Sequence, residues 1–223
     1  IQSSVTTSLT NFNRDNLLSF NSQYRASEVS RLIDNTDTSI LNNTTSVKLS
    51  KFLTPTTGST VSYNVSFNNA LLHPENGYLS STGGILTSTG FKVGTDTTSE
   101  FFFDDDGEGN LRRYSLVGTT RSYADLQAGS IDYSSGVIKI NNINITSISN
   151  VDDATSLQIR IVVSPSSNDI VPVRNQILEI DFANSTITAS ADNQSSSGSS
   201  ISTSGSGTST TTTVSTSGGS SSY

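Results

Sequence analysis

The sequence predicts a mainly β domain with one N-terminal helix, followed by a low-complexity tail. Short β-branched and aromatic runs recur from Val47 onward at intervals of about 8–12 residues, with turn-forming residues between them. A single stretch of helical periodicity precedes these runs. The second choice of class is α+β.

Three regions are expected from changes in composition. Residues 1–44 form a helical lead-in, 45–182 a β-rich domain, and 183–223 a Ser/Thr/Gly-rich tail. The tail contains too few apolar side chains to offset the entropy of ordering it, so we expect it to be disordered or extended. Because the chain begins at Ile1 and contains no methionine, we also expect a fragment or a processed piece.

Apolar residues at helical spacing predict one amphipathic helix from Ala26 to Leu41 that fades near Asn42, with Ser27 as its N-cap. Beyond it the apolar period changes to two, which is typical of strands. The expected strands, in chain order, are a hairpin of Val47–Leu53 with Val61–Phe67, short strands at Ile85–Leu86 and Phe91–Val93, a hairpin of Phe101–Phe103 with Leu111–Val117, a hairpin of Ser130–Tyr133 with Val137–Ile140, the strand Leu157–Val163, and Val171–Asp181 as either a last strand or a short helix.

Charge and composition exclude several partners. The net charge is −7 and the twelve Lys and Arg residues are scattered, so the basic stripe of a nucleic-acid-binding protein is missing. No apolar run approaches the ~20 residues of a membrane helix. Cysteine is absent, which excludes disulfides and thiolate metal sites. We expect no cofactor, no nucleic acid and no membrane partner.

The acidic loop Asp104–Asn110 is the one metal candidate, because clustered carboxylates suit calcium. It does not fit the EF-hand pattern, since Ser115 stands at the twelfth position, where that pattern needs a bidentate glutamate. The loop is therefore predicted to be a solvated hairpin turn, and no metal site is expected.

No enzymatic pattern is found. His73 is the single histidine, and no nucleophile elbow accompanies it. The carboxylate pairs Asp152–Asp153 and Asp125 with Asp132 fit a glycosidase only if the fold brings them together in a cleft. The expected function is non-enzymatic, with no catalytic residue.

Five stretches carry a resemblance to a known family. They are SRLIDNTDTSILNNTTSVKL, VSYNVSFNNALLHPENG, FFFDDDGEGNLRRY, GSIDYSSGVIKI and SNDIVPVRNQIL. In this order they resemble the inner baseplate wedge protein of T-even-type contractile-tailed bacteriophages. The resemblance covers roughly Glu28 to Asp181 and fits the C-terminal portion of that longer protein.

The resemblance implies a structural subunit without catalysis. Its copies would join by self-association, with dimer contacts, into a ring around the tail hub, beside other baseplate wedge proteins. The implied location is the tail baseplate of the virion, after assembly in the host cytoplasm.

The closing motif supplies the candidate contact residues between subunits: Val171, Val173, Arg174 and Ile177. A guanidinium fork such as that of Arg174 suits an interface because it binds carboxylate or carbonyl oxygens. The competing interpretation places the three apolar residues in the core of the domain.

Two other functions stay open. A β-rich adhesin or carbohydrate-binding surface module with a Ser/Thr-rich stalk would use exposed tyrosines, for which the candidates are Tyr63, Tyr78, Tyr114 and Tyr123. The least supported is a tail-associated glycan hydrolase.

Overall fold

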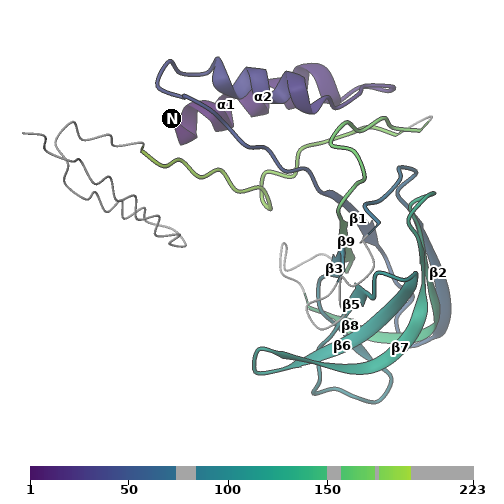
Figure 1. Ribbon diagram of the computed structural model, residues 1–223. Helices are drawn as coiled ribbons and strands as arrows, with labels where there is room; N and C mark the ends of the chain where they lie inside the picture. Colours follow the sequence, from purple (N-terminus) through teal and green to yellow (C-terminus); the bar gives the residue numbers. More distant parts are fainter. Residues whose placement is uncertain (74–83, 150–156, 174–175, 192–223) are drawn as a thin grey trace, which may run out of the picture.

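The computed structural model describes residues 1–73, 84–149, 157–173 and 176–191. Figure 1 shows a pair of helices at one end and a β structure at the other. The helical part consists of α1 (Gln2–Phe12), the π-helical turn η1 (Asn13–Leu17) and α2 (Ala26–Asp34). The predicted class, mainly β with an N-terminal helix, is confirmed.

The predicted helix corresponds to α2, but it ends at Asp34, well before Leu41. The residues that follow, Asn35-Thr36-Asp37-Thr38, are weak helix formers, and the chain turns there. A further helix, α1, occupies residues where the sequence showed no clear period. Three threonine hydroxyls of α1 donate to the carbonyl one turn earlier, and the buried Val5 and Phe12 hold its inner face.

Within the described residues, nine strands form two sheets. The smaller sheet has the order β1-β9-β3 and the larger has the order β2-β8-β4-β5-β6-β7, with a further pairing of β7 with β8. The strands are β1 (Leu49–Leu53), β2 (Thr60–Ser66), β3 (Leu86–Ser88), β4 (Phe91–Val93), β5 (Phe101–Asp105), β6 (Asn110–Val117), β7 (Thr120–Asp132), β8 (Val137–Ile148) and β9 (Ile159–Val163).

The long strand β8 closes the larger sheet into a small barrel. Val137–Ile140 pair with both β2 and β7, Ile143 and Asn144 continue the pairing with β2, and residues 145–148 pair with β4. A bulge opposite Ser62 interrupts the pairing with β2, with Asn142 at φ 37° donating its N–H to the Ser62 hydroxyl. A bulge bends a strand, and the bend allows β8 to pair with strands on different sides of the closed sheet.

Two predicted hairpins are confirmed: β5 pairs with β6 around the acidic loop, and β7 pairs with β8 around Ser134–Gly136. The short strands near residues 86 and 91 and the strand β9 are also present. The predicted hairpin of Val47–Leu53 with Val61–Phe67 is wrong. Here β1 pairs with β9 and β2 with β8, so the two strands belong to different sheets.

The described residues of 171–181 form neither a strand nor a helix. This part of the chain runs back along the helices instead. The β structure is therefore inserted between the helices and a returning segment, and its two ends lie side by side because Leu49 of β1 is paired with Val163 of β9.

Candidate interaction surface

The returning segment, residues 169–173 and 176–187, is called the strap below. It lies along the helical part and is held there by hydrogen bonds. Tyr24 and Ile170 exchange two backbone hydrogen bonds of 3.0 and 2.8 Å. Farther along, the N–H of Ile180 donates to Oδ1 of Asn13 at 2.8 Å, and the side chain of Gln2 donates to the carbonyl of Ile187 at 2.8 Å.

The strap also caps α2. Oδ1 of Asp169 accepts the N–H of Ala26, the first residue of the helix, at 2.8 Å. A carboxylate at this end satisfies a free N–H and is favoured by the helix dipole. The predicted cap, Ser27, lies inside the first turn and is not the N-cap. Nearby, burial raises the pKa of Tyr24, and the charge of Asp169 adds to that increase.

The described apolar side chains of the strap fall into two groups. Ile170, Leu178 and Ile180 point inward: Ile170 is buried, and the other two pack on the helical core of Phe12, Leu17 and Val29. The exposed apolar residues of the strap are called the outer row, and they are Val171, Val173 and Ile177.

The outer row contains the residues predicted as subunit contacts. Val171 is 52% exposed, Val173 48% and Ile177 49%. In this single chain none of the three is a core residue, so the competing interpretation is wrong for them. Arg174, the fourth predicted contact, lies outside the described residues. Three exposed branched side chains in one short segment are more informative than scattered ones.

Two further exposed apolar residues follow η1. Leu17, Leu18 and Phe20 stand close together in the sequence. Leu17 is buried, but Leu18 is 46% exposed and Phe20 64% exposed. The π-helical turn ends at Leu17, so the chain that follows leaves the helical core. The sequence shows that these apolar residues are close together. Only the end of the π-helical turn distinguishes the buried residue from the two exposed ones.

The acidic loop is a hairpin turn, but the prediction that its carboxylates are solvated is wrong for the first two. Asp104 is fully buried at the end of β5, where Arg112 binds it at 2.9 Å, Arg121 at 2.6 Å, and the Tyr123 hydroxyl at 2.9 Å. Burial raises the pKa of Asp104, against the opposing effect of these donors.

Asp105 points to the opposite face of β5 and is also fully buried. Its carboxylate accepts the N–H of Leu86 at 2.8 Å and the hydroxyl of Tyr133 at 2.7 Å. Burial, and then the hydrogen bond to Asp105, strongly raise the pKa of Tyr133. Asp105 thus joins β3 of the small sheet to the closed sheet, which is a structural task.

Only the third aspartate behaves as a turn residue. Asp106 accepts the N–H groups of Glu108 and Asn110 and the Asn110 side-chain amide. Among the residues that the structure describes, no three His, Asp or Glu side chains are grouped as a metal site would need.

The hairpin between β7 and β8 carries a testable pH dependence. The Asp132 carboxylate accepts the hydroxyls of Ser134 at 2.7 Å and Ser135 at 2.6 Å, and these bonds lower its pKa far below the ordinary 3.8. A carboxylate whose pKa is lowered by folding stabilises the folded state at any pH above its pKa in the unfolded chain. This contribution is lost as the pH falls toward the folded-state pKa. Thermal melting between pH 5 and pH 2 should therefore show a falling melting temperature.

The Asp132→Asn variant should show a shallower fall over the same pH range, because asparagine keeps the turn without titrating. Equal slopes for the two proteins would contradict the assignment of this effect to Asp132.

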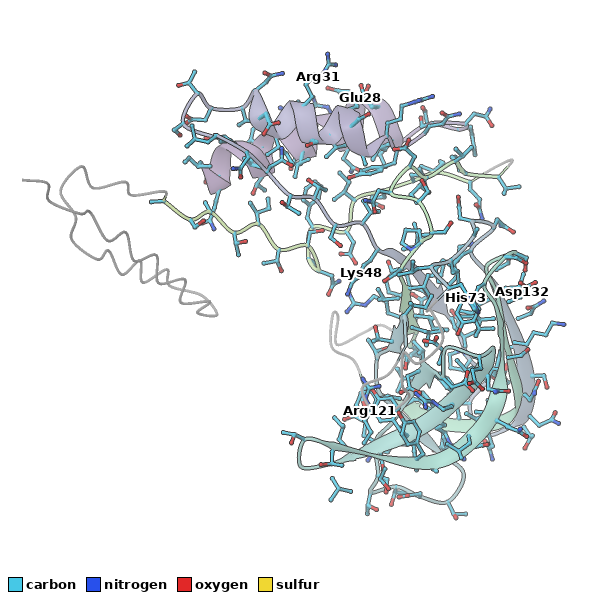
Figure 2. All side chains as sticks on the ribbon, viewed as in Figure 1. Glu28, Arg31, Lys48, His73, Arg121 and Asp132 are labelled. Carbon is cyan, nitrogen blue, oxygen red and sulfur yellow. The ribbon has the colours of Figure 1, made fainter. Side chains whose placement is uncertain are left out.

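The carboxylates considered for glycoside chemistry have structural roles where they are described. Asp132 holds its turn, and Asp125 accepts the N–H of Gln127 at 2.9 Å. Asp152–Asp153 lies outside the described residues. His73 lies edge-on to Tyr133, with 4.7 Å between ring centroids, beside an open hollow of about 520 Å³. Figure 2 shows His73 and Asp132 at this end of the β structure.

The tyrosines proposed for carbohydrate binding are mostly engaged. Tyr114 is buried between Phe102 and Tyr123, with ring centroids at 5.6 and 5.8 Å. Tyr123 bonds Asp104, and the Tyr63 hydroxyl accepts the N–H of Thr56 at 3.0 Å. Tyr78 lies outside the described residues. A stacking platform for sugars therefore receives no support from Tyr114 or Tyr123.

Helices in the described part of the chain are too short or too polar to cross a membrane.

Comparison with known families gives one match. Residues 1–51 fit the family model of the baseplate structural protein gp6, C-terminal domain III. This match supports a structural protein of a phage baseplate. The matched residues comprise α1, η1, α2 and the start of β1. The baseplate similarity also supports a location in the virion tail and contacts with other baseplate proteins, and it favours a structural over an enzymatic role. No curated protein matches the chain.

Proposed function

We propose that this chain is part of an inner baseplate wedge subunit of a contractile-tailed phage of the T-even type. In this role it joins other copies of itself, through dimer contacts, in a ring around the tail hub, and it contacts other wedge proteins. Assembly takes place in the host cytoplasm. The contact surface between copies is the outer row of the strap together with Arg174.

The outer row carries the proposal. The strap is fixed to the helical part at Asp169, Ile170 and Ile180, and the exposed residues of the outer row lie between these anchors in the sequence. A monomer would gain solubility from polar residues there, yet three of the outer positions are branched apolar residues. Burying such side chains at a self-complementary contact supplies free energy of association, at roughly 25 cal/mol for each Å² of apolar surface.

Self-association of the full chain tests the proposal. Multi-angle light scattering at rising concentration should show a dimer or larger species at high micromolar protein. Val173→Asp should weaken the association at least about tenfold in Kd, since it brings an uncompensated carboxylate into the contact. Arg174→Glu should weaken it as well.

The matched control is Val117→Asp, the same substitution at an exposed valine at the end of β6. It should leave the association unchanged. A wild-type chain that stays monomeric at high micromolar concentration, or equal weakening by the two valine variants, would contradict the proposed surface.

A further inference from the structure

Two separate apolar cores divide the described residues into two bodies. One core lies in the helical module, defined as residues 1–45 with the strap, and contains Phe12, Leu17 and Val29 with Leu178 and Ile180 against them. The other fills the sheet module, defined as residues 49–166. No residue belongs to both cores. Moving one module relative to the other therefore leaves each core closed to water.

The connections between the modules are short and irregular. In the first connection, the Asn43 side chain donates hydrogen bonds to Ser30 and Asp34 of α2, and the Thr45 hydroxyl donates to Asn43. Because β1 begins at Leu49, only residues 46–48 connect the two modules here.

In the second, the N–H of Ser166 donates to the carbonyl of Ala70 at 2.9 Å, and Asp169 already caps α2. Residues 167–168 are left between these anchors. Both connections enter the sheet module at the paired ends of β1 and β9 (Figure 1).

One ion pair in the described residues spans the two modules. Nη1 of Arg160 in β9 lies 3.6 Å from Oδ2 of Asp181 in the strap. Both side chains keep some access to water, and ion pairs of this kind contribute little. The pair can bias a position of the modules but cannot hold it rigidly.

We propose that residues 46–48 and 167–168 form a hinge about which the helical module and the sheet module move as two rigid bodies, with Arg160–Asp181 biasing the closed position. Two connections that lie side by side restrict twisting and leave bending free. Hinges of this kind use a few residues at the ends of elements. The inference does not rest on the proposed function.

The chain contains no cysteine, so spin labels can be placed at introduced cysteines without background. One pair, Ser27→Cys with Thr119→Cys, spans the modules at two exposed positions. The control pair, Thr119→Cys with Lys139→Cys, lies within the sheet module. Double electron–electron resonance measures both distance distributions in the full chain. The labelled protein is diluted with unlabelled protein, so that self-association adds no distances between labels on different copies.

The pair across the modules should give a distribution at least twice as broad as the control pair. Asp181→Asn, which removes the charge of the ion pair, should broaden it further or shift its maximum. A distribution as narrow as that of the control would overturn the hinge. A broad distribution that does not respond to Asp181→Asn would overturn the role of the ion pair.

Discussion

Replacing Asp104 by alanine is expected to lower the free energy of unfolding by about 3–5 kcal/mol, the loss typical of breaking a buried ion pair. The cause is the partner left behind. Arg112 is 4% exposed and would keep its charge without the carboxylate that it now binds at 2.9 Å. Arg121 and Tyr123 would lose the same acceptor. Urea unfolding followed by circular dichroism measures the change.

Glu108→Ala is the matched control, because Glu108 is an exposed carboxylate in the same loop. It should change the unfolding free energy by no more than about 0.5 kcal/mol. If Asp104→Ala cost no more than this control, water would be replacing the carboxylate and the cluster would not contribute to stability.

Gly129→Ala is expected to cost about 3 kcal/mol, at the upper end of what overpacking usually costs. A methyl group at this position of β7 would lie 1.9 Å from the carbonyl oxygen of Lys139, in the paired strand β8. The obstacle is backbone, so no side-chain rotation relieves the overlap, and the pairing of β7 with β8 has to open. Loss of that pairing removes one closure of the sheet.

Gly118→Ala adds the same methyl group on the turn between β6 and β7, where nothing lies within 4 Å of it. Its φ of +65° leaves only backbone strain, about 1–2 kcal/mol. Equal unfolding free energies for the two variants would show that β7 and β8 do not approach as closely as described.

The sequence predicted elements where the determining residues are neighbours. The hairpin of β5 with β6 is an example, because Asp106 and the following glycines supply the turn locally. A near-continuous apolar run likewise located β9, and short apolar stretches between turn residues located the short strands.

The sequence did not predict features that depend on distant partners. The cap of α2 comes from Asp169, which is 143 residues beyond Ala26. The burial of Asp104 depends on the register that places Arg112 opposite it in β6 and on Arg121 and Tyr123 from β7. β1 and β2 looked like a hairpin because local alternation says that a strand is half buried and nothing about which strand lies beside it.

The candidate surface was predictable in part. The residues of the outer row come from the closing motif, and they are exposed in a strap that is neither a last strand nor a helix. That conformation depends on Asn13 and Tyr24, which hold the strap from the other end of the chain. The exposure of Leu18 and Phe20 and the burial of Leu17 could not be predicted without knowing where η1 ends.

The strap has a consequence for how the gene can be divided. Residues 1–51, the stretch that matches the baseplate family model, encode the helices but only one side of their core. The other side is encoded more than a hundred codons later, by Leu178 and Ile180. The middle of the gene could be replaced without opening this core, because its product leaves and re-enters the helical module at adjacent points.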